Sequence, residues 1–198
     1  YLKELRSGGE IGFDEAQLLR GFFQYFEYLK PRLVSFNGRT FDLPVLKYRA
    51  MAHGIAAPWL YGAGDKWNSY MSRYAIDWHC DLLDVLRDYG ASTAVKLSEV
   101  SAVMGLPGKF GVDGSKVAEM IEAGDIQGVR DYCETDVLNT YLLYLRTMLH
   151  RGTLPRDGYN RAVADIITMI EHADDDRNHL ESFMLAWGEA SNNTFILE

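Results

Sequence analysis

The amino-acid sequence predicts a fold of the α/β class, and three observations support this prediction. The segments RLVSF (residues 32–36) and AIDWHC (residues 75–80) are short apolar runs of the kind that form buried strands. Between and after them, apolar residues recur at the three- and four-residue intervals typical of amphipathic helices. The length of 198 residues suits a single domain with a sizeable core. Helices and strands that alternate in this way build a sheet flanked by helices.

The first expected helix covers residues 14–30, where apolar side chains follow a helical period. Asp14 and Gln17 have the spacing of a capping box, in which each side chain bonds the other residue's backbone N–H. Pro31 ends this helix, because proline cannot continue it. A second helix is expected over residues 43–53.

The second half of the chain is predicted to be mainly helical. Helical patterns cover residues 82–89, 97–104, 115–123 and 126–150, and two more helices are expected between 159 and 187. The segment RGTLPRDG (residues 151–158) has the composition of a linker. We therefore expect residues 1–152 to form one domain and residues 153–198 to form a helical C-terminal extension packed on it.

The number of expected strands is small. Besides the two apolar runs, YLKEL (residues 1–5) is a candidate for a third strand. Two or three strands are few for a stable sheet. Either further strands escape the sequence pattern, or the chain begins partway through a larger domain.

The composition is that of a globular protein, with 47% hydrophobic and 13% aromatic residues. No stretch approaches an apolar transmembrane span and none has the pattern of a signal peptide, so we expect a cytoplasmic protein. Cys80 and Cys133 form no CxxC pair. This favours two buried thiols in a reduced compartment over a disulfide or a zinc site.

The formal net charge of −8 and the pI near 5.1 bear on the class of partner. A surface that grips long duplex nucleic acid through many phosphates is usually basic, so the charge argues against that class. It is compatible with an enzyme that holds a strand end in a cleft with divalent cations, because the cations reverse the local field of a carboxylate pocket.

The stretch SFNGRTFDLPVL (residues 35–46) sets a tight turn before a helix. Asn37 and Gly38 both tolerate positive φ and are typical of hairpins, yet no second strand follows them. One interpretation makes Asp42 the helix N-cap. In the other, Asp42 is a metal ligand, because a carboxylate at the C-terminal end of a strand points into the crevice where α/β sheets bind ligands. Asn37 and Phe41 would then offer a nucleotide a hydrogen-bonding amide and a stacking face.

A second motif, DYCETDVLNTY (residues 131–141), lies in the longest expected helix. Tyr132 and Asp136 are four residues apart and therefore share a face, whereas Glu134 points elsewhere. Val137 is expected to pack this helix on the core. Taken alone, the pair is also compatible with an ordinary amphipathic helix that carries a surface aspartate and a half-buried tyrosine.

Taken together and in this order, FNGRTFD (residues 36–42) and YCETD (residues 132–136) resemble the second and third motifs of the DEDD superfamily of 3′→5′ exonucleases. This superfamily has a ribonuclease H-like fold, a mixed sheet flanked by helices, and includes the proofreading domains of DNA polymerases. The spacing of Tyr132 and Asp136 matches its tyrosine-bearing subclass. The sister subclass has a histidine where this chain has Asp131.

Longer phrases extend the resemblance over most of residues 13–150. They are similar to bacterial proteins predicted to be related to the exonuclease domain of family B polymerases: LVSFNGRTFDLPVL, DLLDVL, LPGKFGVDGSKV and YCETDVLNTYLLYLR.

The resemblance implies a role for each matching residue. Asp42 and Asp136 would ligate a pair of Mg²⁺ or Mn²⁺ ions, and Tyr132 would orient the attacking water. Asn37 and Phe41 would hold the terminal nucleotides of a single-stranded DNA or RNA 3′ end. Such a pair of ions, ~3.5–4 Å apart, stabilises both the attacking and the leaving oxygen of a displacement at phosphorus. The sequence does not distinguish DNA from RNA as the substrate.

One part of the family pattern is missing. The first motif is Asp-x-Glu on the first strand and supplies two of the four acids, but no aspartate in this chain has a glutamate two residues later. Either the chain is a fragment that lacks its first strands, or it is a degenerate member that has lost catalysis. We favour the fragment because Asp42, Tyr132 and Asp136 persist together. With two acids, we expect the chain alone to bind metal poorly and to have little activity.

Four other features are candidates for function. Asp81 begins a helix as an N-cap or supports the metal site, and His79 is expected to be structural. Lys109 lies in a glycine-flanked loop, where it would reach a phosphate or remain solvated. The aromatic residues between 59 and 74 could stack on bases or pack in the core.

Three functional hypotheses follow from the sequence. The leading one is a metal-dependent 3′→5′ exonuclease, and the second is a non-catalytic nucleic-acid-binding or interaction module on the same fold. The third is an α/β protein whose motif matches are accidental, with Asp42 and Asp136 far apart in the folded chain.

Overall fold

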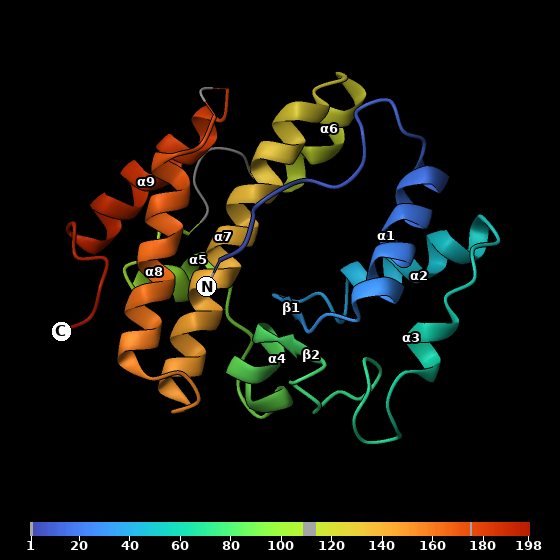
Figure 1. Ribbon diagram of the computed structural model, residues 1–198, viewed down its shortest axis with the longest axis horizontal. Helices are drawn as coiled ribbons and strands as arrows, with labels where there is room; N and C mark the ends of the chain where they lie inside the picture. The colour runs from blue at the N-terminus through green and yellow to red at the C-terminus, as the bar shows by residue number, and fades with distance from the viewer. Residues whose placement is uncertain (1, 109–113, 175) are drawn as a thin grey trace. The chain divides into compact units, whose positions relative to one another are not determined.

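The computed structural model describes residues 2–108, 114–174 and 176–198 (Figure 1). The chain divides into two compact units. One unit is Gly8–Ala94, and the other contains the residues up to Ser7 together with Val95–Glu198. The first carries the Asn37–Asp42 motif and the second carries the Tyr132–Asp136 motif.

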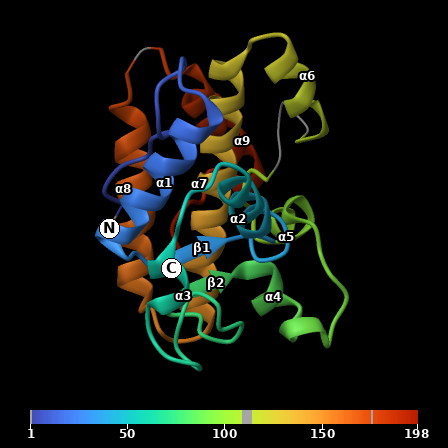
Figure 2. The ribbon, with the colours of Figure 1, turned by 90° about the vertical axis from the view of Figure 1, so that its right-hand side faces the viewer.

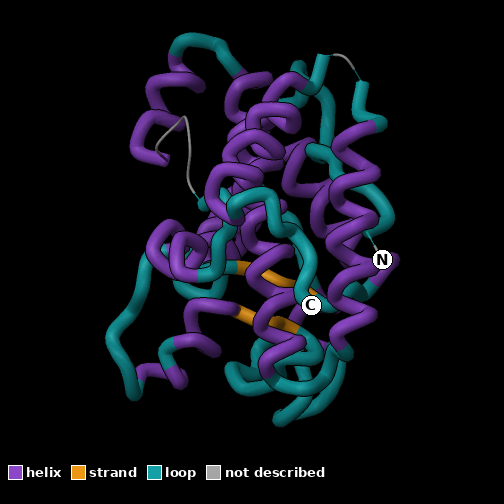
Figure 3. Tube along the Cα trace, turned by 90° about the vertical axis from the view of Figure 1, so that its left-hand side faces the viewer, coloured by secondary structure: helices purple, strands orange, loops and turns teal. Residues whose placement is uncertain are grey.

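The Gly8–Ala94 unit is built on a two-stranded parallel sheet. Its elements are α1 (Glu15–Leu29), β1 (Leu33–Ser35), α2 (Asp42–Ala52), α3 (Pro58–Gly62), β2 (His79–Asp81), α4 (Leu82–Leu86) and the 3-10 helix η1 (Asp88–Gly90). The strands pair in the register Leu33↔His79, Val34↔Cys80 and Ser35↔Asp81. Figure 3 shows them side by side in orange, and Figure 2 shows α4 leaving directly from the end of β2.

β1 lies inside its predicted run, whereas β2 overlaps the run of residues 75–80 only at His79 and Cys80 and extends to Asp81, because residues 75–78 form turns. The two strands and the surrounding helices confirm the α/β class. The candidate strand at the N-terminus is wrong, because residues 2–5 have no regular secondary structure. The capping box of α1 is confirmed: Asp14 accepts from the N–H of Gln17 at 2.8 Å, and the Gln17 side chain accepts from the N–H of Asp14 at 2.8 Å.

The core of this unit is aromatic. Phe23 of α1, Trp59 of α3 and Tyr70 are buried, and the rings of Trp59 and Tyr70 meet edge to face with their centroids 5.6 Å apart. Tyr61 and Trp67 from the same stretch are exposed. The aromatic cluster of residues 59–74 is therefore divided between the core and the surface.

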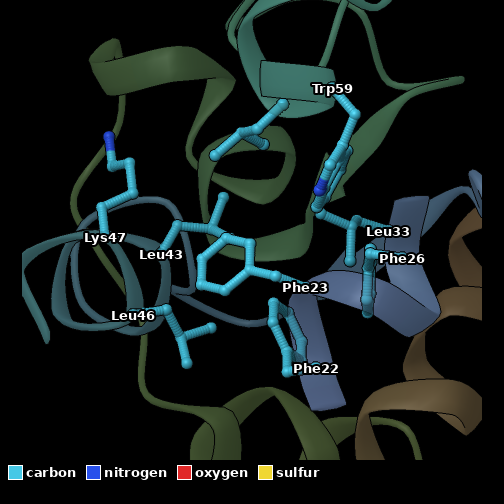
Figure 4. A pocket seen from close by; sticks show the side chains of 9 residues that line it. Phe22, Phe23, Phe26, Leu33, Leu43, Leu46, Lys47 and Trp59 are labelled. Carbon is cyan, nitrogen blue, oxygen red and sulfur yellow. The ribbon is translucent and has the colours of Figure 1, made fainter. Parts of the chain in front are cut away.

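A small apolar pocket lies between α1, α2, α3 and β1 (Figure 4). In Figure 4, Leu43 and Leu46 of α2 face the phenylalanine rings of α1, and the ammonium group of Lys47 points away from them. The lining residues are Phe22, Phe23, Phe26, Leu33, Leu43, Leu46, Lys47, Trp59 and Leu60. This packing fixes the helix that begins at Asp42.

The second unit is helical. Its elements are α5 (Leu97–Val103), the 3-10 helix η2 (Gly114–Lys116), α6 (Val117–Glu122), α7 (Ile126–His150), α8 (Arg156–Glu171) and α9 (Asn178–Ser191). The bounds of α7 match the sequence prediction. Helix α8 begins inside the segment predicted as a linker, since Pro155 is its N-cap and Arg156 its first residue.

Helices α7, α8 and α9 pack against one another, and Figure 1 shows them side by side in yellow, orange and red. Leu142 of α7, Ile166 of α8 and Phe183 and Trp187 of α9 are completely or almost completely buried. The division into residues 1–152 and 153–198 stays a prediction about functional domains. In the structure, α8 and α9 share one compact unit with α7.

A buried ionic cluster ties α9 to α7. Glu134 of α7 accepts from Arg177 and, at 2.8 Å, from His179 Nε2, and Ser7 Oγ donates to it at 3.3 Å. His179 Nδ1 also lies 3.4 Å from Asp131. Burial opposes ionisation of Glu134, but the hydrogen bonds from Arg177 and His179 outweigh it and lower its pKa.

Two sequence expectations about the environment can be compared with the structure. Among the described residues, no helix is both long and apolar enough to cross a bilayer. Neither cysteine forms a disulfide, but Cys133 is exposed, so the expectation of two buried thiols is confirmed for Cys80 alone.

The first prediction tests the contribution of α9 to this unit. Trp187→Ala removes a buried ring that contacts Phe183 and Phe195 at centroid distances of 6.2 and 4.9 Å. We expect the free energy of unfolding, measured by urea denaturation, to fall by about 3–5 kcal/mol. The control Leu185→Ala truncates an exposed residue of the same helix and should stay within about 0.5 kcal/mol of the wild type. Equal effects of the two substitutions would contradict this packing.

The second prediction concerns Glu134 and pH. Its folded-state pKa lies below its ordinary value, so its contribution to stability is present above the unfolded pKa and is lost as pH falls through the folded pKa. Glu134→Gln should reduce this acid-side loss and cost about 3 kcal/mol at neutral pH, because Arg177 loses a buried partner. Urea denaturation across a series of pH values measures both effects. The exposed control Glu189→Gln should behave like the wild type, and parallel pH curves for all three proteins would refute the assignment.

Candidate active site

The candidate site begins where the two parallel strands end. Ser35 and Asp81 are register partners at the carboxyl ends of β1 and β2. Parallel strands of α/β proteins bind ligands beyond this end of the sheet. In the Gly8–Ala94 unit, the chain leaves β1 into the turn that leads to α2, and it leaves β2 directly into α4.

Asp81 organises this end of the sheet. Its carboxylate is buried and accepts from three backbone N–H groups: Asn37 at 2.9 Å, Arg39 at 2.8 Å and Leu83 at 3.1 Å. The bond from Leu83 confirms Asp81 as the N-cap of α4. The other two bonds hold the turn that follows β1, so one side chain fixes the exits of both strands.

The Asn37–Gly38 turn has two different requirements. Asn37 adopts φ +69°, which asparagine tolerates better than most residues. Gly38 needs its small size rather than a positive φ, because an added Cβ would lie 2.5 Å from Ser35 Oγ and 3.3 Å from Asp42 Oδ2. The turn therefore brings the start of α2 close to the end of β1, and it makes no hairpin.

Asp42 is the first residue of α2, and the interpretation of Asp42 as its N-cap is wrong. The N-cap is Phe41, whose side chain makes no capping bond, and the N–H of Leu43 bonds to the carbonyl of Gly38 at 2.8 Å. Although Asp42 as a residue is exposed, partial burial of its carboxylate raises its pKa, and the charge of Asp81 raises it further. A cation beside Asp42 would relieve both effects.

Asn37 and Phe41, which both precede Asp42, have side chains in different environments. The side-chain oxygen of Asn37 accepts from the Thr40 hydroxyl, and its backbone carbonyl accepts from the N–H of Phe41 at 3.1 Å. The Phe41 ring is 64% exposed. The Asn37 amide is thus held within the turn, whereas the Phe41 ring is free to stack on a ligand.

Basic groups surround the inner side of the turn. Arg39 reaches the carbonyls of Tyr70 and His79 at 3.3 and 3.4 Å, and His79 Nε2 lies 2.8 Å from Ser35 Oγ. Burial, together with the charge of Arg39, lowers the pKa of His79 to about 4. His79 is therefore neutral at pH 7 and holds Ser35, in line with its expected structural role.

The second motif lies in the other unit. Tyr132 and Asp136 are both on α7, four residues apart and half-buried. The Tyr132 carbonyl accepts from the Thr135 hydroxyl at 2.8 Å. The expectation that Val137 packs on the core is wrong, because this side chain is exposed. The structure thus gathers Asn37, Phe41 and Asp42 in one unit, and Tyr132 and Asp136 in the other.

The side chains that could bind a metal in each unit are separate carboxylates rather than a cluster of ligands among the described residues. Among the described residues, no group of three or more His, Cys, Asp or Glu side chains is arranged to hold a metal. At the carboxyl ends of the strands, both oxygens of Asp81 already accept backbone N–H groups, and the carboxylate of Asp42 offers a further hard oxygen ligand of the kind that suits a divalent ion. Lys109, a candidate phosphate contact, lies outside the described residues.

Sequence reasoning missed the long-range contacts of Asp81, Arg39 and Glu134, which organise the surroundings of the two motifs. Asp81 was considered as a helix cap, but its bonds to the Asn37 turn connect residues more than 40 positions apart. Arg39 and Glu134 were given no role. Arg39 lies inside the FNGRTFD motif, and this position could have indicated its importance. The partners Arg177 and His179 lie 43 and 45 positions from Glu134, and no sequence pattern connects them with it.

The family comparison covers both units. A family model described as "Predicted 3'-5' exonuclease related to the exonuclease domain of PolB" matches residues 2–187. No curated protein and no solved structure matched the chain. The matched segment contains the Asn37–Asp42 turn and the Tyr132–Asp136 helix. The chain therefore belongs to the family of predicted 3′-5′ exonucleases related to the exonuclease domain of PolB.

Proposed function

We propose that this protein is a metal-dependent 3′→5′ exonuclease that releases 5′-mononucleotides from the 3′ end of single-stranded nucleic acid, with DNA as the first substrate to test. The observation that carries the proposal is the family match over residues 2–187. Our proposal also includes a ribonuclease H-like fold, membership of the tyrosine-bearing subclass and a cytoplasmic location. The parallel sheet, with functional residues at the carboxyl ends of its strands, is compatible with that fold.

In the proposed reaction, an oxygen of water bonds to the terminal phosphorus, and the bond from phosphorus to the 3′ oxygen of the preceding nucleotide breaks. Asp42 and Asp136 would hold Mg²⁺ or Mn²⁺, and two bound ions would generate the hydroxide and neutralise the charge that develops on the phosphate. The raised pKa of Asp42 supports its role, because a nearby cation favours the ionised carboxylate.

The other motif residues would position the substrate. The exposed Phe41 ring would stack on the terminal base, and the turn at Asn37 would lie beside the sugar and phosphate. Tyr132, one helical turn before Asp136, would orient the attacking water through its hydroxyl group. Arg39 and Asp81 would act indirectly, by holding the turn that carries Asn37 and Asp42.

A non-catalytic nucleic-acid-binding module is the second candidate. It is favoured by two observations: the chain has no Asp-x-Glu sequence, and no cluster of three or more metal-binding side chains exists in the described parts of the structure. This candidate keeps the Phe41 stacking face and dispenses with the metal. The release of mononucleotides is the measurement that separates it from the exonuclease.

The third prediction separates these candidates. The longest natural form of the protein that contains this chain is incubated with a 3′-labelled single strand and Mn²⁺. Asp42→Asn and Asp136→Asn should each lower the cleavage rate by at least a hundredfold, since each removes a charged ligand of the ions. The matched control Asp157→Asn changes an exposed aspartate of α8 and should leave the rate unchanged. No release by the unmodified protein, with oligonucleotide binding retained, would favour the non-catalytic module.

The fourth prediction concerns Asp81 as a positioning residue. Asp81→Asn replaces one carboxylate oxygen by an NH₂ group, which cannot accept from the backbone. We expect a loss of about 1–3 kcal/mol in the free energy of unfolding, with cleavage reduced as the turn loosens. The control Asp77→Asn removes an exposed ion pair with Arg32 and should cost at most about 1 kcal/mol. Full stability and activity of Asp81→Asn would exclude the positioning role.

A further inference from the structure

Helix α2 is apolar on two opposite faces. On its inner face, Leu46 and Ala50 pack against the core around Phe23. On the opposite face, Phe41, Val45 and Tyr48 follow one another at intervals of four and three residues, which places them in a single stripe. We call these three residues the α2 stripe.

The α2 stripe is open to solvent. Phe41 is 64% exposed, Val45 43% and Tyr48 67%. A surface helix normally has one apolar face toward the core and a polar face toward water. Exposed apolar side chains gathered in one place mark a binding surface more often than scattered ones do. The second apolar face of α2 is therefore a candidate binding surface.

The charge of the surrounding chain indicates the class of ligand. Between Glu27 and Asp65 the sequence contains five Lys or Arg residues and a single acid, Asp42, in a protein whose net charge is −8. Three of these basic residues already face acids, since Arg32 pairs with Asp77, Arg49 with Glu15, and Arg39 lies beside Asp81. Lys30 and Lys47 have no ion-pair partner among the described residues. Lys47 is on α2 itself, one residue before Tyr48, and its positive charge favours an anionic ligand such as the phosphates of nucleic acid.

The α2 stripe also begins at the proposed reaction centre. Phe41 adjoins Asp42, and Tyr48 lies seven residues further on, or ~10 Å along the helix axis. That span corresponds to two or three nucleotides of a strand. Aromatic rings spaced in this way let successive bases stack without regard to sequence, which an enzyme that shortens any strand requires.

We propose that the α2 stripe is the track for the single strand upstream of the cleaved end: the 3′-terminal base contacts Phe41, a base further toward the 5′ end stacks on Tyr48, and Lys47, next to Tyr48 in the sequence, neutralises a backbone phosphate at the side of the helix. The inference rests on the proposed function and adds a substrate-binding residue, Tyr48, outside the sequence motifs. It also explains how a chain of net negative charge holds nucleic acid, because the basic segment is local.

The test is fluorescence anisotropy with a labelled oligothymidine of about 12 nucleotides in EDTA, so that binding is measured without cleavage. Tyr48→Ala should raise the Kd about fivefold to a hundredfold, as expected for the loss of one stacked base. Tyr48→Trp should preserve affinity. The control Tyr28→Ala removes a side chain that is 85% exposed on α1 of the same unit, and it should leave the Kd unchanged.

Each alternative outcome overturns the inference. The wild type could fail to bind the oligonucleotide, or Tyr48→Ala and Tyr28→Ala could have the same Kd. Tyr48→Ala could instead dissociate a dimer, as seen by sedimentation, without altering oligonucleotide affinity; the α2 stripe would then be a protein interface. If the protein cleaves the strand but Tyr48→Ala leaves the oligonucleotide Kd unchanged, the proposed track is refuted and the exonuclease is not. If binding depends on Tyr48 but no cleavage occurs, the exonuclease is refuted and the track is not.

Discussion

The interaction on which the candidate site depends is the set of three hydrogen bonds to the Asp81 carboxylate. This buried anion accepts from the N–H groups of Asn37, Arg39 and Leu83, and so connects the turn after β1 with the start of α4. Removing a carboxylate from water is costly unless its oxygens are bonded, and here backbone donors satisfy both of them. The position of Asp42 follows, because the turn that Asp81 holds leads directly into α2.

The same anion affects the ionisation of Asp42. Partial burial of Asp42 raises its pKa, and the negative charge of Asp81 raises it further because the two carboxylates repel each other. Arg39 compensates from the inner side of the turn, where its guanidinium bonds backbone carbonyls. A divalent ion on the outer, exposed side would complete the compensation. The acidic composition of the chain is thus compatible with binding an anionic strand at this edge of the sheet.

Much of the local structure could be predicted from the sequence because its causes are local. The α1 capping box involves residues three positions apart, and the bounds of α7 follow from a helical period over residues 126–150. β1 was recognisable as a short apolar run, whereas the run at residues 75–80 shares only His79 and Cys80 with β2. Tertiary contacts were not: Asp81 reaches Asn37 across 44 positions, and Glu134 reaches His179 across 45. No periodic pattern in the sequence reveals pairs of residues that are so far apart. Gly38 was explained by φ, whereas the structure shows that the reason is the space beside Ser35.

The central claim is most directly tested by identifying the products and the direction of cleavage. A single strand labelled at its 5′ end is incubated with the longest natural form of the protein and Mn²⁺, and the products are resolved by gel and mass spectrometry. The exonuclease account predicts a ladder that shortens one nucleotide at a time from the 3′ end, with 5′-mononucleotides released. Immediate loss of the 5′ label, internal cuts, or products with a 3′-phosphate would contradict it.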